Sequence, residues 1–423
     1  MRVTLVCLLG LWWVLGFGQR ERKSLWQEKL DDYNIKFTVG VQFWTTYTMG
    51  QEVYDPTDGR YETVENRITT ELHRSRLAIS GQPYRQLKFN LTSSLDFVGR
   101  DLLSGTQGGA NNGPSPSFRI WNAYLQWNLV PKMDILHVTV AYMPPQIGRE
   151  SISPALRVTS MDKAWSQNYL RRQLVGTGPG RSAGVNIGGL TYEEGRMLNF
   201  SYDIGVFNPV FHSFLGNSMG AKATPLITAR AVLHFGDPET ENYSIGHKIN
   251  YFGRRKGVSI AAAGAYQGET EIFDQNTALS LDLLWNWSSF NLDGEWNFLK
   301  RNRGDLEAPS GVGHLRASYN FMLPKEKILE LVLMYSTFRG SLEESDQREA
   351  NRLGAFAGED STTSLGLNFY FNPDLKLTIN YSRRKADEGD ANPGVTFNNY
   401  FFQNGVGAIK RGNWIGLGVV GIF

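Results

Sequence analysis

Apolar and polar residues alternate along most of the chain, with the period of two that is typical of β-strands. In residues 278–287 one face holds leucine and tryptophan and the other holds serine, aspartate and asparagine, with Leu284 as the exception. After Ser288 and Ser289 the alternation resumes, and two runs joined by two residues predict a β-hairpin. The same pattern recurs on both sides of Pro373. Paired strands are therefore the dominant predicted element.

Sixteen segments can be assigned as strands in this way. They span residues 35–47, 67–80, 86–97, 118–128, 134–142, 182–191, 197–207, 226–235, 257–267, 278–287, 290–299, 314–322, 328–337, 363–371, 375–383 and 412–423. The linkers alternate between short and long, and the long ones include 48–66, 98–117, 143–181, 299–312, 338–362 and 384–411. Linker 236–256 breaks this rule, because it is long where a short turn is expected, and an extra hairpin would fit there.

An even number of alternating strands, with short turns at one end and long loops at the other, is typical of outer-membrane barrels. We therefore expect an all-β chain that forms a transmembrane antiparallel β-barrel over residues 35–423. A soluble β-sandwich is the alternative, since an apolar face can also pack against a second sheet. Aromatic residues near the strand ends favour lipid, because they resemble the girdles at membrane interfaces. They include Trp285, Trp287, Trp296, Phe298, Phe369, Phe371 and Tyr381.

Both chain termini add to this interpretation. The last strand ends at Phe423, a position typical of the signal that the barrel-insertion machinery reads, so we expect that machinery as a partner. Residues 1–18 have the pattern of a secretory signal peptide, the alternative being a buried N-terminal helix. The only cysteine, Cys7, lies inside this segment, so the mature chain would have no disulfide and no thiolate site. Residues 19–34 are expected to form a short periplasmic segment.

Composition narrows the functional classes. Lysine and arginine total 43 against 41 acidic residues, a net charge of +2, so no global field favours nucleic acid. With 41% hydrophobic residues the chain can bury enough surface to fold, which argues against disorder. Any electrostatic function must therefore be local.

A barrel of about sixteen strands leaves an aqueous channel, so function depends on what narrows it. The longest linker, 143–181, follows the fifth strand and is the expected constriction loop. Its basic residues are our candidate pore-constriction and anion-binding residues: Arg149, Arg157, Lys163, Arg171, Arg172 and Arg181. Glu150 and Asp162 lower the local excess to +4, and a solvated, self-paired basic loop is the alternative.

The alternation also assigns charged residues to the lumen face of the strands. The basic ones are Lys36, Arg74, Arg76, Lys88, Arg230, Arg316 and Lys376, and the acidic ones are Asp96, Asp203, Asp282, Asp293, Glu295 and Glu330. Seven against six is nearly balanced. Opposed walls of charge and ordinary lumen salt bridges are both compatible with this set.

Several motifs resemble the phosphate-selective porins of O and P type. They are LHRSRLAISG (residues 72–81), NAYLQW (122–127), VTVAYMPPQIGRES (138–151), PGRSAGVNIGG (179–189) and LNFYFNPDLKLTINYSR (367–383). MDKAWSQNYLRRQLVG (161–176) is similar to the version in Bacteroidetes-type chains. The resemblance covers most of residues 67–423 and implies a trimeric, sixteen-stranded porin of the bacterial outer membrane.

The resemblance also implies a mechanism. Inward arginine and lysine side chains would guide small anionic solutes, phosphate or other oxyanions, past the third loop. The matching positions here are Arg74, Arg149, Arg171, Arg172 and Arg181. Lumen acids dilute any arginine ladder, and no lysine cluster marks a pore entrance. Passive diffusion of small solutes with an anion bias is therefore the expected function.

Two rival functions were weighed against the porin. A barrel hydrolase needs a serine–histidine pair, yet the six histidines lie in no motif and no G-x-S-x-G occurs, so we expect no enzyme. No H-E-x-x-H or paired histidine suggests a metal, and no cofactor is expected. A non-conducting structural or adhesin-type barrel remains the alternative.

Overall fold

The structure is a computed structural model that describes residues 30–105, 117–209, 222, 224–395 and 401–423. The expected signal peptide, residues 1–18, lies outside the described residues, as does most of segment 19–34.

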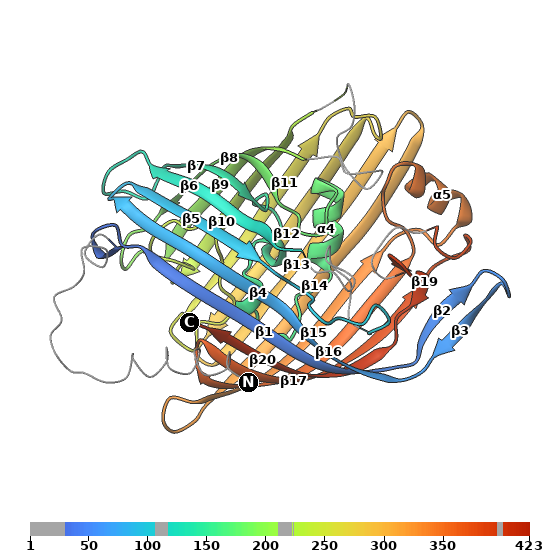
Figure 1. Ribbon diagram of the computed structural model, residues 1–423. Helices are drawn as coiled ribbons and strands as arrows, with labels where there is room; N and C mark the ends of the chain where they lie inside the picture. Colours follow the sequence, from blue (N-terminus) through green and yellow to red (C-terminus); the bar gives the residue numbers. More distant parts are fainter. Residues whose placement is uncertain (1–29, 106–116, 210–221, 223, 396–400) are drawn as a thin grey trace, which may run out of the picture.

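Sixteen antiparallel strands form one closed barrel (Figure 1). In chain order they are β1 (Lys36–Met49), β4 (Arg67–Tyr84), β5 (Leu87–Ser94), β6 (Arg119–Asn128), β7 (His137–Met143), β8 (Ser182–Thr191), β9 (Leu198–Asn208), β10 (Leu226–Gly236), β11 (Gly257–Gln267), β12 (Gln275–Trp287), β13 (Phe290–Arg303), β14 (Leu306–Met322), β15 (Ile328–Arg339), β16 (Glu359–Asn372), β17 (Leu375–Asp387) and β20 (Asn413–Ile422). β20 pairs with β1 from Gly40–Ile422 to Met49–Asn413, so the sheet has no free edge. Each strand corresponds to one predicted segment, which confirms the predicted fold class.

Two sequence-based expectations about linkers are wrong. The expected long linker 299–312 is instead the tip of a hairpin, since β13 and β14 stay paired as far as Arg303–Leu306. Segment 237–256 contains no strand, so the extra hairpin is not there. Its polar side chains find partners inside the lumen, as described below, and these contacts replace the pairing that a hairpin would give.

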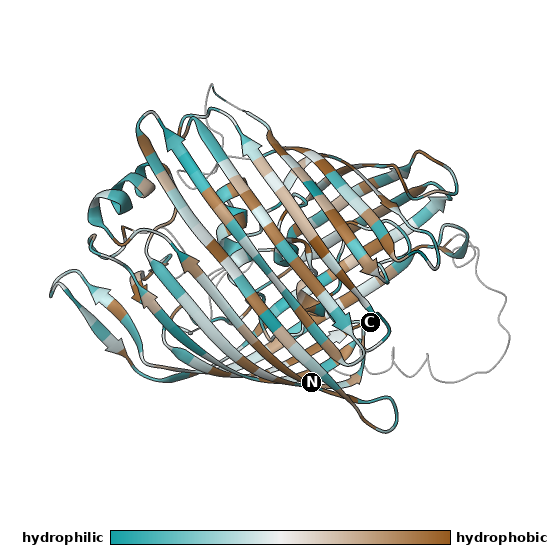
Figure 2. Ribbon diagram, turned by 180° about the vertical axis from the view of Figure 1, so that it is seen from behind, coloured by the Kyte–Doolittle hydropathy of each residue, from teal (hydrophilic) through white to brown (hydrophobic). Residues whose placement is uncertain are grey.

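The outer surface of the barrel is apolar, and brown and teal positions alternate along each strand (Figure 2). Leu279 and Leu281 are about half exposed, at 51% and 50%, as expected for side chains that face lipid. Trp287 at 59% and Trp127 at 54% lie near strand ends on the same surface. Such a band, closed on itself, allows strands to cross a membrane because every strand edge is paired. Among the described residues, no helix combines the length and apolar character needed to cross a membrane.

The constriction loop, residues 144–181, folds into the lumen. It contains α3 (Arg149–Ile152), a 3-10 turn (Ala155–Arg157) and α4 (Ser166–Val175), which lies inside the barrel wall (Figure 1). The apolar side chains of α4 belong to one core cluster with the inward alanines Ala263, Ala265 and Ala278, and the helix lies nearest to β12, β13 and β14. Small inward residues on β11 and β12 leave space in the lumen beside the helix.

Segment 237–256, here called the turn segment, also folds into the lumen, from the end where the short turns lie. Its Ile249 packs with Val158 of the constriction loop and with Leu284 of β12. This contact explains why Leu284 breaks the alternation, since it faces inward but is covered by apolar side chains.

The long loops at the other end carry further structure. β2 (Gln51–Asp55), β3 (Arg60–Val64), β18 (Phe402–Gln403) and β19 (Gly407–Lys410) form a small four-stranded sheet. The loop between β15 and β16 carries α5 (Glu344–Arg352), which lies at the same end of the barrel (Figure 1).

Candidate functional site

A first ion-pair network fixes the constriction loop to one side of the lumen. Arg149 of α3 donates to Glu239 of the turn segment at 2.7 and 3.0 Å and to Asp282 of β12 at 3.0 Å. Asp282 also accepts from Arg230 of β10, at 3.0 Å for Nη2–Oδ1. Arg149 is fully buried. It therefore joins the constriction loop, the turn segment and the wall in one neutralised cluster.

A second network lies beside the first. Arg316 of β14 donates to Glu150 at 2.8 Å and to Asp293 at 2.7 Å, and His314 lies 3.1 Å from Asp293. Glu150, Asp293 and His314 are close enough together to ligate one metal ion. The Arg316 guanidinium already supplies the positive charge that these carboxylates need. We therefore assign the cluster as a structural anchor of the loop.

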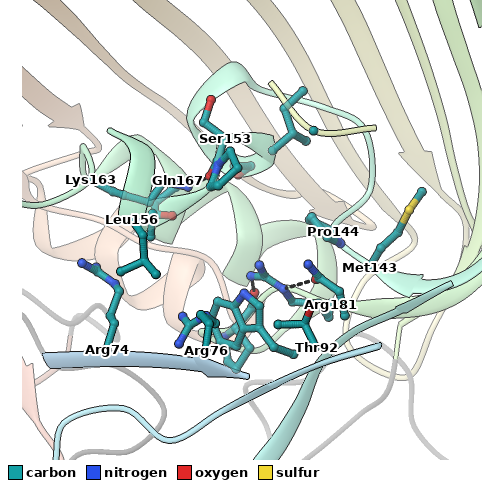
Figure 3. A pocket seen from close by; sticks show the side chains of 18 of the residues that line it. Arg74, Arg76, Thr92, Met143, Pro144, Ser153, Leu156, Lys163, Gln167 and Arg181 are labelled. Atoms are coloured by element: carbon teal, nitrogen blue, oxygen red, sulfur yellow. Dashed lines mark hydrogen bonds between the residues drawn. The ribbon is translucent and has the colours of Figure 1, made fainter. Parts of the chain in front are cut away.

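The opposite side of the lumen holds a cavity of about 420 Å³. It lies between β4, which carries Arg74 and Arg76, and the part of the constriction loop that carries Leu156 and Lys163 (Figure 3). Two further cavities, of about 180 and 740 Å³, share lining residues with it toward the turn end. The shared residues include Leu156, Arg157, Tyr124, Ser244 and Ile245. The first cavity therefore adjoins two others, the 740 Å³ cavity beside β5 and β6 and the 180 Å³ cavity beside β16, β17 and β20.

The cavity is strongly basic. Seven of its lining residues are cationic: Arg74, Arg76, Arg119, Arg157, Lys163, Arg171 and Arg181. Asp96 is its one acidic lining residue among the described part of the chain. The nearly balanced lumen charge of the sequence is therefore separated in space, with paired networks on one side and a cationic cavity on the other.

Three of the cavity cations have a carboxylate partner, and one of them is Arg157, which forms an ion pair with Asp374 in the turn between β16 and β17. Arg74 lies 2.6 Å from Asp162 and also donates to Gln42 at 2.8 Å. Arg76 forms an ion pair with Asp96. The constriction loop thus contributes Asp162 to one wall arginine, and the loop after β5 contributes Asp96 to the other.

Three cations of the constriction loop have only neutral partners. Lys163 donates to the carbonyl of Ser153 at 2.8 Å, and Arg171 donates to the carbonyl of Ser151. Arg181 donates to Asn122 Oδ1 at 3.3 Å and to the Pro179 carbonyl. Within the described residues none of the three forms a salt bridge, although each is more than nine-tenths buried. Such uncompensated positive charge favours an anion in the cavity.

Burial and repulsion between neighbouring cations both favour the uncharged form of a loop cation. Burial lowers the pKa of Lys163 well below its ordinary value, and the neighbouring Arg171 lowers it further, although Glu150 opposes this. An anion in the cavity would reverse part of that shift, because an opposite charge favours the protonated amine.

Backbone irregularities aim several cavity side chains inward. The register between β5 and β6 passes from Thr92–Asn122 to Ser93–Ile120, so Trp121 is an extra residue in a β-bulge. The bulge lets the adjacent Trp121 and Asn122 both line the cavity, which strict alternation forbids. A similar shift between β1 and β4 leaves His73 without a register partner, beside Arg74.

Glycine allows a close approach at Arg171. Gly180 has a φ of 62°, and a Cβ there would collide with the Arg171 stem. This left-handed backbone conformation is costly for residues other than glycine. The Pro179–Gly180–Arg181 sequence therefore holds Arg171 and Arg181 next to each other.

The predicted site residues separate into two groups. Arg157, Lys163, Arg171 and Arg181 line the cavity, as do Arg74 and Arg76 from the wall. Arg149 was expected in the constriction but is an anchor, because Glu239 and Asp282 neutralise it. Arg172 is half-buried on α4 and is not among the lining residues.

Three other predicted wall cations lie outside the 420 Å³ cavity. Arg230 and Arg316 belong to the anchor networks, and Lys88 lines the 740 Å³ cavity. Sequence reasoning missed Trp121 and the turn segment. The length of linker 236–256 was the available signal for the latter, whereas the bulge in β6 shifts the phase of the alternation, so strict alternation places Trp121 on the outer face.

No protein-family model matches this chain, and no curated protein sequence matches it. Solved structures do share its fold. OprB from Pseudomonas putida has a TM-score of 0.59 at 10% identity, over 94% of this chain and 96% of that one. OmpF from Salmonella typhi, in complex with daunomycin, has a TM-score of 0.53 at 12% identity, over 93% and 98%. An anion-selective porin from Comamonas acidovorans has a TM-score of 0.53 at 11% identity, over 92% and 99%. The chain therefore has the closed-barrel fold of outer-membrane porins.

Proposed function

We propose that this protein is a porin of the bacterial outer membrane, a water-filled channel for passive diffusion of small solutes that prefers anions. The cationic cavity is the observation that carries this proposal. Seven cations against one acid line it, and Lys163, Arg171 and Arg181 have no carboxylate partner among the described residues. A permeating anion at this point would compensate charge that the protein leaves uncompensated.

The apolar outer band and the neighbours' fold support the location. Lipid would cover the half-exposed leucines, and the barrel-insertion machinery would read the last strand, β20, together with Phe423. The anion-selective porin from Comamonas acidovorans shows that this fold can carry anion selectivity. The sequence resemblance to phosphate-selective porins of O and P type supports oxyanions as substrates and a homotrimer as the assembly.

A non-conducting barrel is the second candidate, because two segments fill the lumen here. The constriction loop and the turn segment meet through Arg149–Glu239 and Val158–Ile249. The connected cavities beside β4 to β6, of about 420 and 740 Å³, favour a conducting path beside this contact.

Single-channel recording in planar lipid bilayers tests the proposal. Purified, refolded protein should give discrete conductance steps in potassium chloride, and the reversal potential in a salt gradient should show preference for chloride over potassium. Absence of steps from correctly folded protein would establish the non-conducting barrel. Steps with a cation preference would reject the anion-selective mechanism.

A further inference from the structure

The uncharged lining of the cationic cavity is rich in carbon. Leu156 and Pro154 of the constriction loop face wall residues that include Trp121 and Tyr124 of β6. Pro154 is exposed and the other three are half-buried, so their carbon surface is available to a solute. A bare, strongly hydrated inorganic anion gains nothing from contact with such a surface, whereas an organic anion does.

Two guanidinium groups stack on one indole ring in this cavity. The Cζ atoms of Arg76 and Arg181 lie 4.1 and 3.8 Å from the centroid of Trp121. Guanidinium planes also stack on other aromatic rings, and their N–H groups donate to carboxylates in the plane. The bulge at Trp121 thus places an aromatic and cationic surface against the path of a solute.

The cations around Trp121 differ in their partners. Asp96 pairs with Arg76, whereas Arg181 donates only to Asn122 and to the Pro179 carbonyl. Arg171 and Lys163 follow on the loop side, likewise bound only to carbonyl oxygens. A carboxylate would bind on the side of these three cations, and its apolar body would lie toward Trp121 and Leu156.

We propose that the cavity selects amphiphilic organic anions, with aromatic monocarboxylates as the simplest class, over small inorganic or aliphatic anions of equal charge. The inference rests on the proposed anion-preferring channel and names its substrate class. A volume of about 420 Å³ accommodates a ring with its carboxylate. The loop cations supply the charge recognition, and the carbon lining supplies the discrimination.

The test compares three probes on the wild-type channel: benzoate, acetate and benzyl alcohol. Each is added to a bilayer in potassium chloride, and the concentration that halves the chloride current gives its apparent affinity. Benzoate should bind roughly tenfold more tightly than acetate, a factor typical of burying a ring. Benzyl alcohol should not block, because it lacks the charge.

A matched pair of variants locates the effect on the ring surface. Trp121→Leu should weaken benzoate block by roughly threefold to thirtyfold, the range expected for loss of a stacked cation–π surface. Acetate block should be unchanged. Trp127→Leu changes the lipid-facing tryptophan of the same strand and should leave both values as in wild type.

The outcomes separate this inference from the proposed function. A channel that prefers chloride over potassium but binds benzoate no better than acetate would overturn the inference alone. A channel with no anion preference would overturn both. Equal loss of benzoate block in Trp121→Leu and Trp127→Leu would also contradict the assignment of the site.

Discussion

At the scale of single residues, the position of a charge matters more than its count. Arg149 and Arg171 belong to the same loop, yet Arg149 is neutralised by two carboxylates while Arg171 donates to a backbone carbonyl. A buried cation without a counterion is unfavourable unless an anion is available. The anchor arginines are therefore charge-compensated, whereas Lys163, Arg171 and Arg181 of the cavity are left for solutes.

The lowered pKa of Lys163 gives a pH-dependent prediction. A cation whose pKa is lowered loses its proton at a lower pH than usual, so the cavity loses positive charge as pH rises. Anion preference should therefore decline as pH rises over a range that lies well below the ordinary lysine pKa of about 10.4. Reversal potentials measured across this range check the prediction, and Lys163→Met should flatten the decline. A wild-type profile that rises with pH would contradict it.

At the scale of elements, two segments without strand alternation, the constriction loop and the turn segment, determine the shape of the lumen. The constriction loop enters from the long-loop end, and the turn segment enters from the other. They meet at Arg149–Glu239, while Asn250 of the turn segment donates to Asn320 and Glu330 of the wall at 2.9 Å. The turn segment thus supports the constriction loop from below and occupies lumen space itself.

Shortening the turn segment should enlarge the channel. Replacing residues 241–247 by a two-residue glycine–serine link removes Tyr243, which donates to Asp203 inside the lumen. Single-channel conductance should rise, because the 740 Å³ cavity loses part of its lining. An equal-length glycine–serine replacement is the control that separates lost volume from lost contacts. Unchanged conductance in the shortened variant would show that this segment does not narrow the path.

The arrangement of loops and turns gives a topology prediction. Ser345 on α5 and Asp390 are exposed at the long-loop end, whereas Ser289 and Asp374 lie in turns at the other end. Cysteines at the first pair should react with an impermeant maleimide on intact cells, and cysteines at the second pair should not. The reverse labelling pattern would mean that the barrel is inserted in the opposite orientation.

The sequence predicted the strands well and the interior only in part. Period-two alternation identifies which side chains face inward, so Arg74, Arg76 and Asp282 were assigned correctly to the lumen face. Alternation contains no information on which inward groups meet across the barrel. The pairing of Arg149 with Glu239 joins two linkers that are 90 residues apart, and only the closed fold brings them together. Trp121 escaped prediction because a bulge shifts the register locally.

At the scale of the whole molecule, the barrel combines an apolar exterior with a divided lumen. Leu281, half exposed in the middle of β12, should tolerate no charge: Leu281→Arg should cost about 2–4 kcal/mol of folding free energy. Thr92→Glu, on the wall of the cationic cavity, adds a charge opposite in sign to its surroundings and should cost within about 1 kcal/mol. Refolding titrations in lipid check both values. Similar costs for the two variants would contradict the assigned lipid and lumen faces.

Asn286 also faces the lumen, but it is not suited as the lumen position in the comparison of refolding costs. It accepts from Arg255 at 2.7 Å and donates to the Ile249 carbonyl at 2.9 Å, so it holds the turn segment in place. The alternation assigns Asn286 correctly to the lumen face, but it gives no information on these hydrogen bonds, which an arginine at this position would break.

The separation of lumen charge makes the near-neutral composition compatible with selectivity. Charges in a narrow cavity act at a lower effective dielectric than charges on the surface. A pair 4 Å apart interacts by about 4 kcal/mol at an effective dielectric of ~20, against about 1 kcal/mol in bulk water. Three cations at one constriction without a carboxylate partner among the described residues, Lys163, Arg171 and Arg181, can therefore dominate a chain whose overall charge is only +2.

The reversal potential of two triple variants tests this central claim most directly. The first, Lys163→Met with Arg171→Gln and Arg181→Gln, removes the three cavity cations that lack carboxylate partners. The second, Arg196→Gln with Lys300→Gln and Arg348→Gln, removes three exposed cations and changes the net charge equally. The first should lose the anion preference of the wild type and shift toward cations, while the second should match the wild type. An unchanged reversal potential in the first variant, or an equal shift in both, would contradict control of permeation by the cationic cavity.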